Sequence, residues 1–195
     1  MFVLGIDPGL SRCGYAVVRP LPRSRAEAVA IGVIRTPPGA ELPARLAELQ
    51  RELRSLLIEF GPAVVSVERI FFQNNARTAV GVAQASGLAL AEAASRGIPV
   101  VQYSPSAVKA VVAGDGRADK IQVQTMVQML LGLSSPPKPV DAADAAALAL
   151  CHLAHDPMLR RTPNPNPNPN PGTLTSGTGG RDARSEIPVA PGVRP

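Results

Sequence analysis

Short apolar stretches separated by turn residues dominate the start of the chain. Residues 3–6 form a strand-length apolar run, which Pro8 and Gly9 interrupt at once. A β-rich pattern resumes at residues 14–18, and residues 28–35 alternate well enough between apolar and other positions for a third strand. The pattern therefore predicts a hairpin followed by a third strand.

A long amphipathic helix is predicted at residues 42–60. Its leucines recur at helical spacing, Arg and Glu occupy the opposite face, and a Gly-Pro pair closes it. An apolar strand at residues 63–67 comes next. A strand, helix, strand order implies parallel pairing with an earlier strand. If that partner is the first strand, Asp7 and Glu68 emerge at the same edge of the sheet.

Four helices and one short strand are predicted in the rest of the globular part. The helices fall at residues 74–96, 106–113, 119–131 and 141–155, and the strand at residues 99–103. Mostly small residues line the helix at 74–96, so another helix can approach it closely, either from the same domain or from a second subunit. Together these elements predict an α/β fold with a mixed central sheet flanked by helices.

Composition places the chain among ordinary globular proteins. Of its 195 residues 45% are hydrophobic but only 3% are aromatic, so the core must be aliphatic. We expect no signal peptide and no membrane-spanning segment, because the required apolar runs are missing. Cys13 and Cys151 do not make a disulfide framework. A cytoplasmic protein with reduced thiols is therefore predicted.

The chain changes character near residue 161. Alternating Asn and Pro, followed by Gly, Ser and Thr, cannot bury enough apolar surface to fold. The sequence thus predicts a globular domain at residues 1–160 and a disordered, basic Asn/Pro/Gly-rich tail at residues 161–195. The net charge is +5, but five arginines and two acids from residue 160 onward supply more than half of it. Net charge is therefore weak support for a polyanionic partner.

Four carboxylates stand at the ends of three predicted elements. Asp7 follows the first strand, Glu68 follows the strand at 63–67, and Asp141 and Asp144 fall at the start of the last helix. Each acid alone has an ordinary structural explanation, because Asp favours turns and helix starts. Their joint placement points instead to a shared site.

Four neighbouring carboxylates repel one another, so a cation or protonation must relieve them. Acid clusters without His or Cys favour magnesium or manganese over zinc. His152 stands roughly 12 Å along the helix axis from Asp144, too far to share an ion, since a helix rises about 1.5 Å per residue. We therefore interpret His152 and His155 as surface or core histidines.

Five segments, taken together and in order, resemble the RuvC-type crossover junction endonucleases, which have an RNase H-like fold. The segments are GIDPGLSRCGYAV at residues 5–17, VERIFFQNN at 67–75, SAVKAVV at 106–112, GRADKIQVQTMV at 116–127 and DAADAAALALCH at 141–152. The resemblance runs from residue 1 to about residue 155. The Asn-Pro tail departs from the family pattern.

The resemblance implies that Asp7, Glu68, Asp141 and Asp144 are catalytic and bind two Mg²⁺ ions, with Mn²⁺ able to substitute. It implies DNA contacts by Lys109 and Lys120 near the scissile phosphate and by Phe71 at the junction bases; neighbouring Phe72 and Arg117 are further expected contacts.

Family members are homodimers that cut two opposed strands of a four-way Holliday junction symmetrically, in recombination and repair. The cuts leave 5′-phosphate and 3′-hydroxyl ends, and the RuvA and RuvB branch-migration proteins are partners. The resemblance therefore implies the same activity and partners for this chain.

Three alternatives remain at this point. A phosphate-binding ATPase domain of the actin and sugar-kinase type also places an Asp and a Gly at a hairpin, but it needs two such domains and a longer chain. A non-catalytic junction-binding module would use the acids only as caps. A YqgF-like RNA nuclease shares the fold but is shorter and lacks the junction-contacting pattern.

Overall fold

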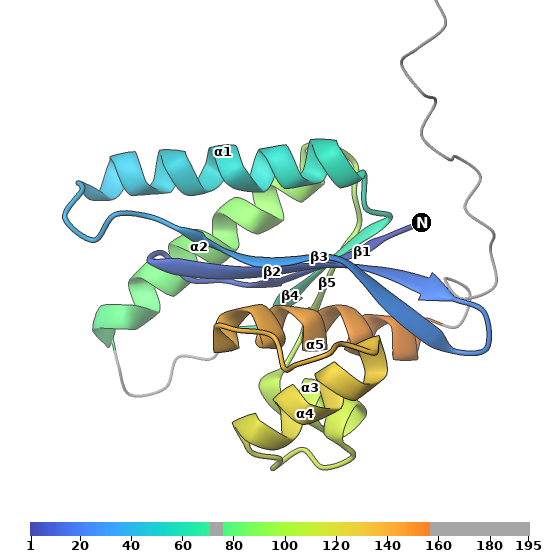
Figure 1. The fold of residues 1–195 in the computed structure, drawn as a ribbon. Helices are drawn as coiled ribbons and strands as arrows, with labels where there is room; N and C mark the ends of the chain where they lie inside the picture. Colours follow the sequence, from blue (N-terminus) through green and yellow to red (C-terminus); the bar gives the residue numbers. More distant parts are fainter. Residues whose placement is uncertain (71–75, 157–195) are drawn as a thin grey trace, which may run out of the picture. The chain divides into compact units, whose positions relative to one another are not determined.

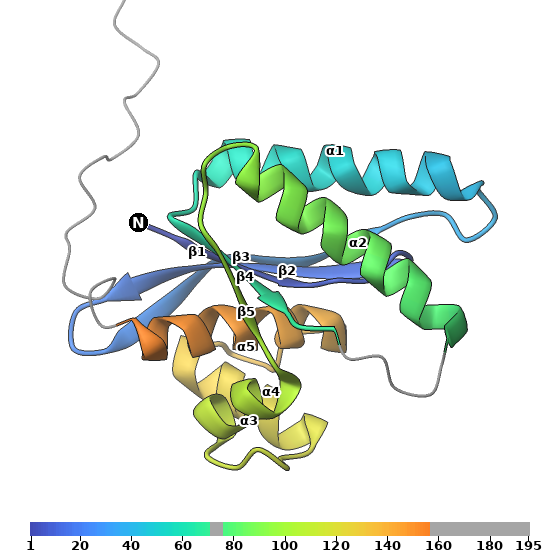
Figure 2. The ribbon, with the colours of Figure 1, turned by 180° about the vertical axis from the view of Figure 1, so that it is seen from behind.

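The computed structural model describes residues 1–70 and 76–156, which belong to one compact unit. A five-stranded sheet lies between two groups of helices (Figure 1). Helices α1 (Leu42–Phe60) and α2 (Ala76–Ala94) cover one face. Helices α3 (Pro105–Ala113), α4 (Lys120–Leu131) and α5 (Val140–His155) cover the other, as the reverse view in Figure 2 also shows. The predicted α/β fold with a mixed, helix-flanked sheet is confirmed.

The strand order is β3-β2-β1-β4-β5. Strands β1 (Val3–Asp7), β2 (Arg12–Leu21) and β3 (Arg25–Arg35) form an antiparallel meander. Strands β4 (Val64–Glu68) and β5 (Val100–Tyr103) continue the sheet in parallel with β1. The predicted parallel pairing of the first strand with the strand after α1 is therefore confirmed, and it brings the carboxyl ends of β1 and β4 to one edge.

The β2–β3 hairpin extends further than the hydrophobic pattern predicts. Its outer part is partly solvated, and Arg19 on β2 forms an ion pair with Glu27 on β3 at 2.5 Å. The turn places Arg23 and Ser24 at φ values of 62° and 57°. Backbone pairing, rather than apolar alternation, holds this end of the hairpin, which explains why the sequence pattern misses it.

Helix α5 is the most deeply buried helix of the described chain. Its alanines pack directly on the sheet, and Gly5 on β1 makes room for the helix backbone, because a Cβ there would overlap the carbonyl oxygen of Ala145. Gly14 on β2 plays the same part against the carbonyl oxygen of Asp141. Close backbone packing thus sets the position of the amino end of α5.

Helix α2 uses its small residues for packing inside the domain. Ala85, Ala89 and Ala93 are at most 1% exposed and join the core between α1 and the sheet. The small residues therefore allow close packing within the domain, which is one of the two predicted possibilities. None of the described helices is long and apolar enough to cross a membrane.

Glu92 ties α2 to α1 through a charged network. It is 5% exposed, and its carboxylate accepts hydrogen bonds from Arg54 at 2.9 Å, Gln50 at 2.7 Å and Arg96 at 2.6 Å. These bonds, above all those from Arg54, lower the pKa of Glu92 to about 2. The fold therefore stabilises the ionised carboxylate.

Glu92→Gln is expected to lower the free energy of unfolding by about 1–3 kcal/mol at pH 7, because charge-assisted bonds are lost at a buried position. The folded pKa lies below the ordinary value of 4.5, so the stabilisation is present above pH 4.5 and is lost as the pH falls toward 2. Urea denaturation at pH 7 and pH 3.5 measures this loss. The exposed Glu59→Gln on α1 is the control, and an equal effect of Glu92→Gln at both pH values would contradict the prediction.

Candidate active site

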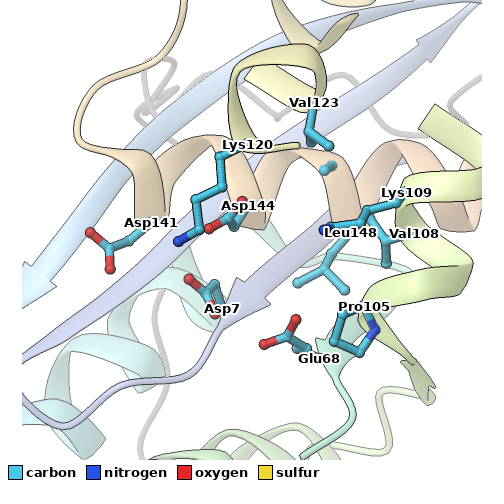
Figure 3. Close-up of a pocket in the computed structure, with 11 residues that line it drawn as sticks. Asp7, Glu68, Pro105, Val108, Lys109, Lys120, Val123, Asp141, Asp144 and Leu148 are labelled. Atoms are coloured by element: carbon cyan, nitrogen blue, oxygen red, sulfur yellow. The ribbon is translucent and has the colours of Figure 1, made fainter. Parts of the chain in front are cut away.

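Four carboxylates from three elements line one hollow. Asp7 is the last residue of β1, Glu68 is the last residue of β4, and Asp141 and Asp144 lie in the first turns of α5. Figure 3 shows the four side chains. The hollow that they line has a volume of about 370 Å³. The four acids identified from the sequence are therefore neighbours in space.

The carboxylates are poorly solvated and repel one another. Burial, followed by the charges of Glu68, Asp144 and Asp141, raises the pKa of Asp7 to about 8. Burial is also the largest cause that raises the pKa values of Glu68 and Asp144. At neutral pH the cluster thus holds protons or requires cations to carry its full negative charge.

Two lysines line the same hollow. Lys109 projects from α3 and Lys120 is the first residue of α4; both appear beside the acids in Figure 3. The Lys120 charge lowers the pKa values of Asp7, Glu68 and Asp144 against the larger effect of burial, and Lys109 acts in the same direction on Asp144. The structure therefore places both predicted lysines next to the carboxylates.

Of the other three predicted DNA contacts, only Arg117 belongs to the described residues. Arg117 is exposed in the loop before α4 and is absent from the lining, while its backbone N–H donates to the Asp115 side chain at 2.9 Å. Phe71 and Phe72 lie outside the described residues. Their roles remain predictions.

Two arginines that the sequence analysis did not single out lie on the other side of the acids. The Arg12 guanidinium Nε is 3.4 Å from Asp141 Oδ2. Arg12 and Arg45 line a second hollow of about 580 Å³, to which Asp7, Glu68 and Asp141 also contribute. Arg12 lies in GIDPGLSRCGYAV, only five positions after Asp7, and this short spacing could have indicated that it lies near the site. Nothing in the sequence indicated the same for Arg45, because it looked like one of several charges on the solvent face of α1.

The donor set fits a hard divalent cation. Carboxylate oxygens are the ligands that Mg²⁺ and Mn²⁺ prefer. Burial, together with repulsion among the acids, raises the pKa values of Asp7, Glu68 and Asp144, so a bound cation would favour their ionised forms. As the side chains stand, no three Asp, Glu, His or Cys groups in the described parts of the chain surround a point where a metal ion could be held. Asp141 lies toward Arg12 instead. Metal binding therefore requires the carboxylates to turn inward.

The two histidines belong to the far end of α5. His152 is 7% exposed and its Nδ1 lies 2.9 Å from the Tyr103 hydroxyl, whereas the exposed His155 lies 2.9 Å from the carbonyl oxygen of Cys151. Neither residue lines the acidic hollow. Both positions agree with the interpretation of the two histidines as surface or core residues, since His152 is buried and His155 is exposed.

Asp7→Asn is expected to raise the melting temperature in EDTA at pH 7 by on the order of 5 °C, since the neutral amide folds without the proton uptake that the buried Asp7 carboxyl requires at this pH. The folded pKa of about 8 exceeds the ordinary 3.8, so this burden is absent below pH 3.8 and grows as the pH rises toward 8. Added Mg²⁺ should stabilise the wild type more than the variant. Calorimetry with Asp115→Asn as control checks both effects, and a variant that melts below the wild type in EDTA would contradict the first.

Gly14→Ala is expected to lower the free energy of unfolding by about 2–4 kcal/mol, because overpacking displaces the backbone. The added Cβ would overlap the carbonyl oxygen of Asp141 and lie 3.3 Å from the Asp7 Cβ. Mn²⁺ binding, followed by electron paramagnetic resonance, should weaken at least about tenfold, as two ligand-bearing elements move apart. Gly87→Ala, where the new methyl group meets open space, is the control. Equal behaviour of the two variants would contradict the packing argument.

Comparisons with known proteins place this site in a family. A family model described as crossover junction endodeoxyribonuclease RuvC matches residues 3–152. A protein of that name from Salinispora arenicola is 55% identical over 153 residues, which are 78% of this chain and 87% of that relative. One from Thermobifida fusca is 52% identical over 153 residues, covering 78% of this chain and 84% of the relative.

Solved structures agree with this placement. RuvC of Thermus thermophilus, in a complex with a Holliday junction substrate, matches with a TM-score of 0.77 and 36% identity, over 82% of this chain and 97% of that one. The yeast mitochondrial Holliday junction resolvase matches with a TM-score of 0.60 at 19% identity, over 81% of each chain, and supports the RNase H-like fold alone. The chain belongs to the RuvC family of crossover junction endodeoxyribonucleases.

Proposed function

We propose that this chain resolves four-way Holliday junctions by metal-dependent, symmetrical nicking of two opposed strands. The observation that carries the proposal is the convergence of Asp7, Glu68, Asp141 and Asp144 in one hollow, with Lys109 and Lys120 on its wall. Membership of the RuvC family supports the substrate, as does the likeness to a RuvC solved with a Holliday junction. The products are 5′-phosphate and 3′-hydroxyl ends, in homologous recombination and DNA repair.

The four carboxylates would hold two Mg²⁺ ions, with Mn²⁺ as a substitute. When bound, such ions activate a water molecule and stabilise the leaving 3′ oxygen. Asp7 lies close to all three other acids, and the charge of each of them raises its pKa. Asp141 and Asp144 enter from α5, whose position Gly5 and Gly14 set.

Lys120 and Lys109 bring positive charge to the scissile phosphate. Their placement beside the acids lets them hold the phosphodiester over the hollow and oppose the negative charge that develops in the transition state. Phe71 and Phe72 follow Glu68 by three and four positions in the sequence, which supports a role at the junction bases next to the cut.

The chain acts as a homodimer in the cytoplasm, with RuvA and RuvB as partners. A twofold dimer presents two equivalent sites to a twofold substrate, and this arrangement explains paired cuts. The proposed organisation keeps the nuclease domain at residues 1–160 and the disordered basic tail at 161–195. The tail lies outside the described residues.

Cleavage of an end-labelled synthetic four-way junction tests the proposal, with linear duplex as the control and Mg²⁺, Mn²⁺ or EDTA in the buffer. Paired nicks at symmetrical positions are expected on the junction alone, in either metal, and none in EDTA. Binding without nicking in either metal would favour a non-catalytic junction-binding module. Equal cutting of the duplex would remove the proposed specificity.

Family membership does not favour the ATPase alternative of the actin and sugar-kinase type. The RuvC match accounts for Asp7 and the hairpin glycines without a nucleotide site. No ATP hydrolysis is therefore expected.

A further inference from the structure

The acidic cluster separates two hollows of the protein surface. Lys109 and Lys120 line the first hollow, while Arg12 and Arg45 line the second. Asp7, Glu68 and Asp141 contribute to both. A DNA strand whose scissile phosphate lies over the carboxylates must leave the site on two sides. The proposed function gives DNA contacts to the lysine side only.

Arg45 is held in place inside the second hollow. Its Nε donates to Thr36 Oγ1 at 3.0 Å and its Nη2 donates to Ser11 Oγ at 2.6 Å. Thr36 in turn donates its hydroxyl to the carbonyl oxygen of Leu10 at 2.6 Å. The network fixes the guanidinium against the β1–β2 turn, so little side-chain entropy remains to be lost when an anion binds.

Arg45 also has no carboxylate partner among the residues that the structure describes. Within the described parts of the chain no Asp or Glu lies at ion-pair distance from it, although the acids of the cluster line the same hollow. A guanidinium that is oriented by neutral hydroxyl groups keeps its charge available. Its planar fork suits a phosphate oxygen pair better than a lysine would.

Arg12 is the second cation of this hollow and is held differently. Its side chain is 56% exposed, and it forms an ion pair with Asp141 at 3.4 Å. Asp141 is also one of the carboxylates assigned to the metal ions. Once Asp141 turns inward to a metal ion, Arg12 is left beside the hollow without that carboxylate.

Part of the lining of the second hollow is small and apolar. Gly81 and Val82 of α2 line the hollow, and a Cβ on Gly81 would lie 3.4 Å from the Cβ of Leu10. The hollow of about 580 Å³ therefore offers two arginines and apolar groups beside the shared carboxylates. This combination suits a sugar-phosphate chain, which has charged oxygens on one side and apolar sugar edges on the other.

We propose that the hollow lined by Arg12 and Arg45 is a second strand-binding subsite, which takes a phosphate next to the scissile one on the side away from the lysines. The inference rests on the proposed function and extends it. Arg45 is the fixed contact, and Arg12 joins it when Asp141 is engaged by metal. Both residues are positioning residues, because they hold the strand without touching the reacting atoms.

The salt dependence of junction binding tests this subsite without cleavage. Fluorescence anisotropy in Ca²⁺ gives the slope of log Kd against log salt, which should fall by about 0.7–0.9 for each phosphate that the protein no longer binds. Arg45→Gln and Arg12→Gln should each show this reduction. Arg51→Gln, an equal charge change at an exposed position of α1 away from both hollows, should keep the wild-type slope, as should Arg45→Lys.

A neutral methylphosphonate, placed at one phosphate at a time around the cut, locates the bound phosphate on the wild-type protein. At one position beside the cut, the methylphosphonate should weaken junction binding by the wild type severalfold but leave binding by Arg45→Gln unchanged. Unaltered slopes for both variants, or equal sensitivity of wild type and Arg45→Gln at every position, would overturn the subsite. Failure of the proposed function looks different, because wild-type protein would then neither prefer the junction to duplex nor cut it.

Discussion

Asp7→Asn is expected to reduce junction cleavage by more than about 10³-fold while junction binding stays the same or tightens, because the carboxylate that we propose as a metal ligand is replaced by a neutral amide. Asp7 ends β1 at the point where the charges of the three other acids act on it. The substitution takes one acidic group away from the surface that is proposed to receive the scissile phosphate. It leaves Lys109, Lys120, Arg12 and Arg45 in place.

Single-turnover cleavage and anisotropy binding on the same labelled junction separate the two effects. Glu52→Gln, an exposed acid on α1, is the matched loss of one carboxylate. Its cleavage rate and its affinity should equal those of the wild type. A parallel loss of binding and cleavage in Asp7→Asn would count against the assignment of Asp7 as a metal ligand.

Lys120→Met is expected to slow cleavage by about 10²-fold or more, since a cation placed at developing charge contributes on this scale. The Lys120 charge lowers the pKa values of Asp7, Glu68 and Asp144. Without it those pKa values rise, so the ascending limb of the pH–rate profile should move to higher pH. The helix start should survive, because the capping box joins Asp119 and Gln122 rather than Lys120.

Single-turnover rates between pH 6 and pH 9 check this expectation. Lys138→Met removes an exposed lysine that lines neither hollow, and it is the control. A slower reaction with an unmoved pH profile would show that Lys120 acts on the substrate alone. A rate equal to that of Lys138→Met would remove Lys120 from the catalytic machinery.

The sequence predicts that the four acids meet, because each of them stands at the end of a regular element. Asp7 and Glu68 each close a short apolar strand, and a crossover helix makes those strands parallel. Strand geometry then dictates that both acids share an edge. Asp141 and Asp144 follow from the start of an apolar helix in the same way.

The features that the sequence missed depend on interactions between distant segments. Glu92 looked like one more charge near the end of an alanine-rich helix, but its carboxylate accepts hydrogen bonds from two side chains of α1 and one from the turn after α2. Arg45 is oriented by hydrogen bonds to Ser11 and Thr36, which are 34 and 9 positions away in the sequence. Hydrophobic periodicity carries no information about such polar pairs, because it reports only which face is buried.

The exact position of α5 against the sheet is another feature that the sequence does not predict. Its composition predicts a buried helix, yet the close fit requires Gly5 and Gly14 on two neighbouring strands. Neither glycine has an unusual positive φ. Only the structure shows that each glycine is there for close backbone approach, and that Gly14 thereby sets the distance between Asp7 and Asp141.

The central claim is tested most directly by anomalous scattering from crystals grown with Mn²⁺. One crystal holds Asp7→Asn with a junction, because this variant should not cut the DNA. The other holds the wild type without DNA. The account predicts wild-type manganese peaks enclosed by Asp7, Glu68, Asp141 and Asp144, with at least one peak lost or weakened in Asp7→Asn. Wild-type crystals with the Arg12–Asp141 ion pair intact and manganese bound elsewhere would contradict the assignment of these carboxylates as the catalytic metal site.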